Sequence, residues 1–129
     1  MTQSRSVIAS ENAPRAVGPY SQAIRTCNLI FTAGQIPIDP TAGRIVATTI
    51  EEQTRQVLRN LQAVLEAGSS GLDDVVKVTV FMTDLGAFAA MNAVYAEFFK
   101  ADPPARSAVQ VAALPLGAMI EMECVAIVR

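Results

Sequence analysis

The sequence contains no histidine and no tryptophan among its 129 residues. Without histidine, the commonest general base, the Ser–His and Cys–His nucleophile pairs and all His-containing metal sites are excluded. The GxGxxG, Walker A, HExxH and GxSxG motifs are also missing, so no dinucleotide, nucleoside triphosphate, zinc-protease or serine-hydrolase signature is present. Any chemistry must therefore use carboxylates, arginine, tyrosine, hydroxyl groups, the backbone or bound water.

Charge and hydropathy exclude two classes of partner. The net charge is −2, no run of Lys and Arg occurs, and aromatic residues make up 5% of the chain. This composition gives no electrostatic footprint for nucleic acid. No apolar stretch approaches eighteen residues, so we expect no membrane span. Residues 1–11 are polar and carry no secretory signal, which makes the cytoplasm the expected location.

Cysteine usage is sparse. Cys27 and Cys124 are far apart in the sequence, and neither belongs to a CxxC pair. We expect two reduced and buried thiols, with a disulfide between them as the alternative.

The length and composition favour one domain, residues 1–129, that associates with itself. The chain is long enough to bury a core without metals or disulfides, and too short for a separate cofactor domain. Hydrophobic residues make up 51% of it and charged residues only 17%. This excess of apolar surface over one small domain's needs favours self-association.

Hydrophobic periodicity predicts the secondary structure. The helix over 50–67 has an apolar stripe at three- and four-residue spacing, with Thr49 and Glu52 as a capping box and Gly68 as the stop. A second helix over 85–100 begins after Asp84 as the N-cap and ends before Pro103-Pro104. Strands are predicted at 4–9, 23–26, 29–33, 75–82, 105–111 and 119–128. Pro37, Asp39-Pro40 and Gly43 mark a loop that leads to the apolar Ile45-Val46.

This order of elements predicts an α+β fold with a mixed β-sheet and two helices on one face. The strand over 119–128 is apolar on both sides, since Ile120, Met122 and Cys124 alternate with Val125 and Ile127. Two helices cover one face only, so the other face needs a partner, for which a second copy of the chain is the simplest choice. The pattern does not give the number of copies.

Two charged residues are candidates for chemistry. Arg106 enters a strand directly after Pro103-Pro104-Ala105, and its planar guanidinium suits a carboxylate. A structural ion pair is the alternative. Glu121 lies within an apolar strand on the same face as Glu123, where a carboxylate points into solvent, pairs with a cation, or serves a function.

Three further residues have both structural and functional interpretations. Tyr20 follows Gly18-Pro19 on a stiff loop and presents a hydroxyl group. Asn92 interrupts an apolar helical stripe, so its amide bonds a nearby loop or lines a pocket. Gly34 permits a ligand to approach the backbone closely, although turn geometry explains it equally well.

The order of several motifs resembles the RidA/YjgF family. They are Gly18-Pro19-Tyr20-Ser21-Gln22, Gly34-Gln35-Ile36-Pro37, Val78-x-Val80-Phe81-Met82-x-Asp84-Leu85, Asn92-x-x-Tyr95-x-x-Phe98-Phe99, Pro104-Ala105-Arg106-Ser107, Leu114-Pro115 and Ile120-Glu121-Met122-Glu123. The match runs from about residue 6 to residue 129. One such segment is weak evidence, whereas the ordered set is specific.

The resemblance implies a chorismate-mutase-like fold, a homotrimer with clefts between adjacent subunits, and hydrolysis of 2-imino acids or their enamines to 2-keto acids and ammonia. The typical substrates, 2-iminobutanoate and 2-iminopropanoate, arise from pyridoxal-phosphate-dependent dehydratases. By similarity, Arg106 holds the substrate carboxylate and Glu121 activates water. The implied substrate-binding residues are Tyr20, Ala33, Gly34, Asn92, Ala108 and Pro115, and no metal or other cofactor is implied. Electrophilic imines need only orientation and one general base.

Two positions depart from the family pattern. Many relatives have Cys at the position of Ala108 and Ser at that of Ala33, so a thiol and a hydroxyl contact are lost and the identity of the imine stays open. A non-catalytic module that binds keto or imino acids is the main alternative. A pathway-specific enamine deaminase is another. The ribonuclease activity attributed to some relatives is disfavoured by the acidic charge and the lack of histidine.

Overall fold

The computed structural model describes residues 4–129, which form a six-stranded sheet, a two-stranded hairpin and two α-helices. The elements are β1 (Arg5–Ile8), β2 (Ala23–Thr26), β3 (Leu29–Thr32), β4 (Ile38–Asp39), β5 (Arg44–Ile45), α1 (Ile50–Ala67), β6 (Val75–Met82), α2 (Phe88–Phe98), β7 (Ala105–Gln110) and β8 (Ile120–Ile127).

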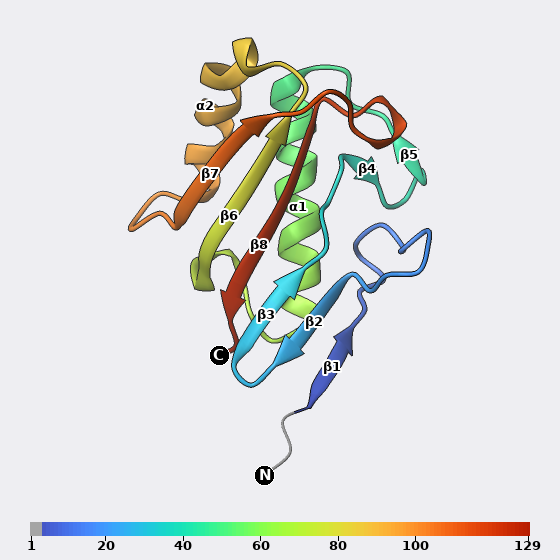
Figure 1. The fold of residues 1–129 in the computed structure, drawn as a ribbon, viewed down its shortest axis with the longest axis vertical. Coiled ribbons are helices and arrows are strands. Elements are labelled where there is room, and N and C mark those ends of the chain that lie inside the picture. Colours follow the sequence, from blue (N-terminus) through green and yellow to red (C-terminus); the bar gives the residue numbers. More distant parts are fainter. Residues whose placement is uncertain (1–3) are drawn as a thin grey trace.

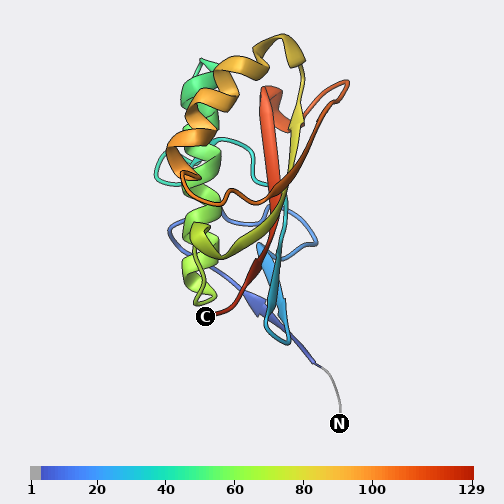
Figure 2. The same ribbon diagram turned by 90° about the vertical axis from the view of Figure 1, so that its left-hand side faces the viewer.

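The strand order in the main sheet is β1-β2-β3-β8-β6-β7. All neighbours are antiparallel except β6 and β7, which are parallel because α2 carries the chain back between them. Both helices lie on one face of this sheet, as Figures 1 and 2 show. The predicted α+β class, mixed sheet and one-sided helices are thus confirmed.

Helix α1 has the predicted bounds, Ile50–Ala67. The Thr49 hydroxyl accepts from the Glu52 backbone N–H at 3.2 Å, as expected of an N-cap. Gly68 does end the helix, but its backbone is not left-handed. A Cβ there would lie 2.7 Å from Ile8 and 2.8 Å from Ile30, so glycine lets β1 and β3 pack closely against the helix end.

The second helix is shorter than predicted. Residues Leu85–Ala87 form a 3₁₀ turn, because the Asp84 carboxylate accepts from the Gly86 N–H at 2.8 Å and caps that turn first. The α-helix then runs from Phe88 to Phe98. Asp84 is therefore an N-cap, as expected, but of the 3₁₀ turn.

Two other expectations need correction. The residues between Pro37 and Val46, expected as a loop, contain the short β4–β5 hairpin. Both cysteines are free, as predicted, but only Cys124 is buried. Cys27 is exposed because it occupies the tight β2–β3 turn with a left-handed φ of 52°, where its side chain has no core to enter.

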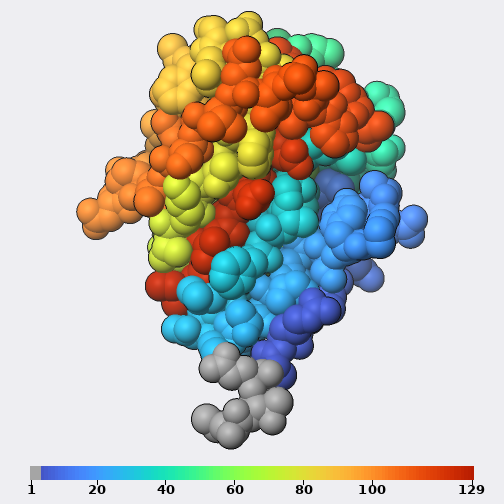
Figure 3. All heavy atoms as spheres, in the orientation of Figure 1, coloured from blue at the N-terminus to red at the C-terminus, as the bar shows by residue number. Residues whose placement is uncertain are grey.

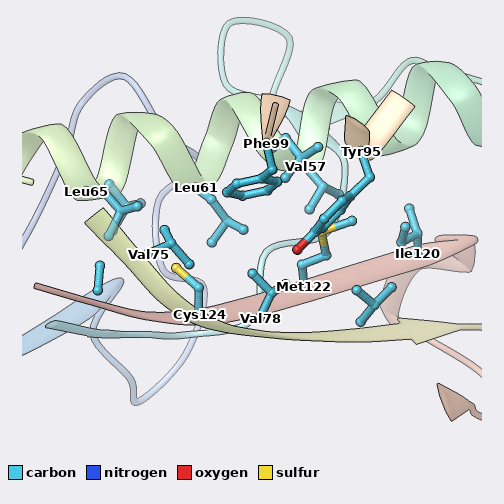
Figure 4. Packing of buried hydrophobic residues seen from close by; sticks show 14 of the residues in the cluster. Val57, Leu61, Leu65, Val75, Val78, Tyr95, Phe99, Ile120, Met122 and Cys124 are labelled. Atoms are coloured by element: carbon cyan, nitrogen blue, oxygen red, sulfur yellow. The ribbon is translucent and has the colours of Figure 1, made fainter. Parts of the chain in front are cut away.

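The core lies between the helices and the sheet, where Val57, Leu61 and Leu65 of α1 face Val78 of β6 and Met122 of β8 (Figure 4). The opposite face of the sheet has no helix. In Figure 3 the strands β3, β6 and β8 are uncovered on this face. Phe31, Val109 and Ile127 are exposed, so the second apolar face expected from the sequence is present.

Candidate functional site

Arg106 lies on the helix-facing side of edge strand β7. In the parallel register it pairs with Val78, which is fully buried beneath the helices. Since residues two apart share a face, Ala108 follows on the same side. Leu85, Phe88, Arg106 and Ala108 line a cavity of about 430 Å³, here termed the Arg106 cavity.

Helix α2 supplies the contacts that hold the guanidinium. Arg106 Nη1 donates to Oδ1 of Asn92 at 2.7 Å. The guanidinium carbon lies 4.7 Å from the ring centroid of Tyr95 and 5.3 Å from that of Phe88. Phe88, Asn92 and Tyr95 are spaced at i, i+4 and i+7, so one stripe of the helix forms this support.

Arg106 has no carboxylate partner among residues 4–129. The two ion pairs in this part of the chain join Arg55 to Glu97 and Arg129 to Asp74, and neither includes Arg106. A partly buried guanidinium held by a neutral amide and aromatic faces keeps its charge uncompensated. Such a group favours an anionic ligand with planar geometry, such as a carboxylate.

Tyr95 is the most buried member of the Arg106 support. Its hydroxyl has no hydrogen-bond partner among the described residues, and Figure 4 shows it directed from α2 into the core. Burial raises the Tyr95 pKa; the nearby Arg106 lowers it and Cys124 raises it. The phenol is thus kept neutral.

Glu121 lies in a second cavity of about 520 Å³, here termed the Glu121 cavity, whose lining also includes Tyr20, Ala33, Gly34, Pro115 and Leu116. Backbone hydrogen bonds fix the segment beside it. Ala33 N donates to Gln22 O at 2.8 Å, and Gln35 N donates to Met122 O at 2.8 Å.

Gly34 and Glu121 are in direct contact. A Cβ added to Gly34 would overlap the Glu121 carboxylate. The backbone of Gly34 is not in the left-handed region, so the absence of a side chain, not turn geometry, is what this position requires. Glycine leaves room for the carboxylate.

The electrostatic surroundings of Glu121 favour a base stronger than an ordinary carboxylate. Burial raises its pKa above the usual value for Glu, and the neighbouring negative charge of Glu123 raises it further. Glu121 has no hydrogen-bond or ion-pair partner within residues 4–129. A carboxylate of this kind is available to exchange a proton.

Tyr20 lies beside the Glu121 cavity, as expected, and also contacts its own loop. Its ring is half-exposed and lines the Glu121 cavity, but its hydroxyl accepts from the Val17 backbone N–H at 3.3 Å. This hydrogen bond stabilises the loop that carries Tyr20, and the O–H group remains available as a hydrogen-bond donor.

Within one chain, the structure separates the two principal residues. Glu121 pairs with Phe81 of β6, whereas Arg106 pairs with Val78, and residues three apart on a strand point to opposite faces. Arg106, Asn92 and Ala108 thus gather on the helix side. The Glu121 cavity is lined by loop residues and by Glu121 of β8, and no residue of α2 contributes to it.

Several residues around Arg106 and Glu121 are not singled out by the sequence analysis. Phe88 and Tyr95 fit the apolar stripe of the second helix, and their i, i+7 spacing around Asn92 is the available signal. Arg15, Val17 and Leu116 also line the Glu121 cavity. They lie on loops, where periodicity gives no information.

Two classes of feature are missing from residues 4–129. No three His, Cys, Asp or Glu side chains converge as a metal-binding group. Neither helix combines the length and apolar character that crossing a bilayer requires.

The sheet, the free guanidinium and the isolated carboxylate define an α+β protein with two candidate sites for small molecules. Residues 10–128 match the family described as Endoribonuclease L-PSP. The chain belongs to this family, which includes RidA and YjgF.

Individual relatives cover nearly the whole chain. It is 55% identical over 122 residues to a RutC family protein of Pyrococcus horikoshii, covering 95% of this chain and 97% of that protein. It is 44% identical over 123 residues to the 2-iminobutanoate/2-iminopropanoate deaminase of Homo sapiens, covering 95% and 90% respectively.

Solved structures agree with the fold. The YjgF gene product of E. coli matches with a TM-score of 0.92 at 46% identity, covering 96% of this chain and 99% of that one. E. coli TdcF, solved with bound serine, matches with a TM-score of 0.91 at 41% identity, covering 96% and 99%.

Proposed function

We propose that this protein hydrolyses reactive 2-imino acids or their enamine tautomers, such as 2-iminobutanoate and 2-iminopropanoate, to 2-keto acids and ammonia. The observation that carries the proposal is Arg106, a guanidinium without an acidic partner among the described residues, held by Asn92 and two aromatic rings. The human deaminase at 44% identity supports the reaction class, and serine bound to TdcF supports recognition of a small carboxylate ligand.

The proposed reaction uses groups of this chain only. Arg106 binds the substrate carboxylate through two parallel N–H donors. Glu121 takes a proton from water, whose oxygen forms a bond to the imine carbon. The imine nitrogen receives that proton, which gives a carbon that carries a hydroxyl and an amine group. Glu121 then passes the hydroxyl proton to the amine nitrogen, the C–N bond breaks, and ammonia leaves as the carbonyl forms. The raised pKa of Glu121 supports both proton transfers.

The remaining site residues have supporting roles in this proposal. Backbone amides near Gly34 and Ala108 bind the substrate, while Tyr20, Ala33, Asn92 and Pro115 shape the pocket. The reaction needs orientation and one general base, which together raise the rate by several orders of magnitude.

The proposal also requires more than one copy of the chain. Arg106 and Glu121 point to opposite faces of the sheet within a protomer, so they can meet only across an interface. The uncovered apolar face with Phe31, Val109 and Ile127 supports such an interface. We propose a cytoplasmic homotrimer with three sites, each built from the Arg106 cavity of one subunit and the Glu121 cavity of the next.

The first experiment is an assay coupled to a pyridoxal-phosphate-dependent threonine or serine dehydratase, with release of ammonia and keto acid as the readout. We expect the wild-type protein to accelerate the release, and Arg106→Ala and Glu121→Ala to abolish the acceleration. A wild-type rate no faster than that of Arg106→Ala contradicts the proposed enzymatic activity. The alternative, a protein that only binds keto or imino acids, is then favoured. RNA cleavage by repurified protein is measured in parallel, and we expect none.

The second experiment tests the shared site by mixing two inactive variants. Arg106→Ala and Glu121→Gln are co-expressed, so that hybrid trimers form. A site between neighbours keeps both residues intact in roughly a quarter of random pairings, so about a quarter of the activity returns. If each site lies within one chain, the mixture stays inactive.

A further inference from the structure

The two most exposed large apolar side chains of residues 4–129 line the same cavity. Val17 is 77% exposed and Leu116 is 72% exposed, and both contribute to the Glu121 cavity. They come from loops almost a hundred residues apart in the sequence. Isolated exposed apolar residues are ordinary, but a pair at the edge of one cavity is not. Val17 and Leu116, here termed the rim, are therefore a candidate ligand contact.

The backbone of Leu116 argues against a passive surface role. Leu116 has φ 58° and ψ 24°, a left-handed conformation that costs free energy for a bulky residue. It lies between Pro115 and Gly117, in a turn where Asn or Gly would relieve the strain and also suit solvent. A strained and exposed leucine at a cavity rim is explained by a contact that its side chain makes.

The loop that carries Val17 is held in place. The buried Gln22 side chain accepts from Ser10 N at 2.6 Å and donates to Pro14 O at 2.7 Å. Val17 N in turn donates to the Tyr20 hydroxyl. The Val17 side chain is therefore presented from a fixed loop.

Other apolar residues line the two cavities beside the polar Arg15, Gln35 and Glu121. Ala33 and Ile36 belong to the Glu121 cavity, and Leu85, Phe88 and Ala108 belong to the Arg106 cavity. The Glu121 cavity alone measures about 520 Å³, far more than a three-carbon imino acid fills, and within the usual range of pockets for larger ligands.

From this rim, and resting on the proposed function, we infer that the preferred substrates are 2-imino acids with a bulky apolar side chain. Val17 and Leu116 would contact that side chain, while Arg106 and Glu121 act on the common imino acid group. Imines of leucine, methionine or phenylalanine belong to this class, and the class of reaction that supplies them is oxidation of the corresponding amino acids.

The test is a substrate panel with isosteric polar variants. Imines are generated in place from alanine, leucine, phenylalanine and aspartate by amino-acid oxidases, and kcat/KM is measured for each. We expect the leucine and phenylalanine imines to exceed the alanine imine by roughly tenfold. Leu116→Asn and Val17→Thr lower the two bulky rates by about the same factor and leave the alanine rate unchanged.

Val7→Thr is the matched control, because Val7 is 64% exposed and does not line either cavity. We expect its selectivity to equal that of the wild type. Asn tolerates the left-handed backbone, so Leu116→Asn stays folded, which thermal unfolding verifies.

Three outcomes overturn the inference. Equal losses on all imines show that the rim is not a side-chain subsite. A preference for the aspartate imine shows that Arg15 binds an acidic side chain in this cavity and that the rim does not select for apolar ones. Dissociation of the oligomer by Leu116→Asn shows that the rim packs against another copy.

The result also separates this inference from the proposed function. If no imine is hydrolysed, the proposed function fails. Calorimetry then compares the affinity for 4-methyl-2-oxopentanoate with the affinity for pyruvate, and this comparison tests whether the rim binds an apolar side chain. Tighter binding of the branched acid, lost in Leu116→Asn, supports the subsite, and equal binding refutes it.

Discussion

Asn92 Oδ1 accepts from Arg106 Nη1 at 2.7 Å, and this bond links helix α2 to edge strand β7. It occupies one side of the guanidinium and leaves other N–H donors for a ligand. A neutral acceptor orients the arginine without cancelling its charge.

Replacing Asn92 is therefore predicted to act on substrate binding. Asn92→Ala should raise KM by roughly tenfold, since a hydrogen bond to a charged group contributes about 1.5–3 kcal/mol and orientation is only partly lost. Asn92→Asp should be worse, because a carboxylate competes with the substrate for Arg106. Steady-state kinetics and titration with 2-oxobutanoate measure both. Arg55→Ala, which breaks the exposed pair with Glu97, is the control and should behave as wild type.

The buried hydroxyl of Tyr95 gives a stability prediction. Tyr95→Phe keeps the ring beneath Arg106 and removes an oxygen that has no partner among the described residues. We expect the free energy of unfolding to rise by about 1 kcal/mol, with activity retained. Tyr95→Leu removes the aromatic face and should raise KM. Urea denaturation and kinetics distinguish the variants; a loss of stability in Tyr95→Phe would show that the hydroxyl is satisfied.

Two glycines should respond in opposite ways to alanine. Gly34→Ala places a methyl group where the Glu121 carboxylate lies, so the carboxylate must move and activity should fall by at least about tenfold at nearly constant stability. Gly43 has open space around it but a φ of 73°. Gly43→Ala should therefore cost about 1 kcal/mol of stability and leave activity intact. Thermal unfolding and turnover are compared for both, and unchanged turnover in Gly34→Ala would contradict the contact.

The pKa of Glu121 predicts two pH effects. Its folded-state pKa is raised by burial and by Glu123, so ionising the carboxylate costs stability, and this cost grows as the pH rises from the ordinary pKa of Glu through the raised folded-state value. Glu121→Gln should consequently unfold at a higher temperature than the wild type at neutral pH, with the difference vanishing below the ordinary pKa of Glu. Calorimetry across pH 3–8 checks the sign.

The same shift predicts the acid limb of the activity. Catalysis needs ionised Glu121, so kcat/KM should begin to fall on acidification at a higher pH than an ordinary Glu would give. Glu121→Gln should lose at least about 100-fold in kcat while still binding 2-oxobutanoate. A pH profile unchanged by this substitution would assign the base elsewhere.

Local sequence signals predicted most of the fold. Helix α1 was predicted to the residue, because its apolar stripe, the Thr49 cap and Gly68 agree. The second helix was predicted too long since the Asp84 cap was read as starting an α-helix and not a 3₁₀ turn. The β4–β5 hairpin has only two residues in each strand, too short for alternation to be visible.

Sequence patterns place the candidate residues on their strands, helices and loops, but they give less of the geometry between them. The alternation in β8 correctly put Glu121 on the face opposite Met122. The face of Arg106 depends on the register of β7 against β6, a long-range pairing that no local pattern encodes. Its aromatic support escaped notice because Phe88 and Tyr95 also fit an ordinary core stripe.

The opposite orientations of Arg106 and Glu121 have a consequence for how such an activity is controlled. In the proposed arrangement a single chain carries both Arg106 and Glu121 yet has no complete site, so the turnover per chain depends on the protein concentration. On the proposed function, dilution below the dissociation constant of the oligomer should silence the activity without unfolding the chain, and a newly synthesised chain should gain activity only when it meets its neighbours.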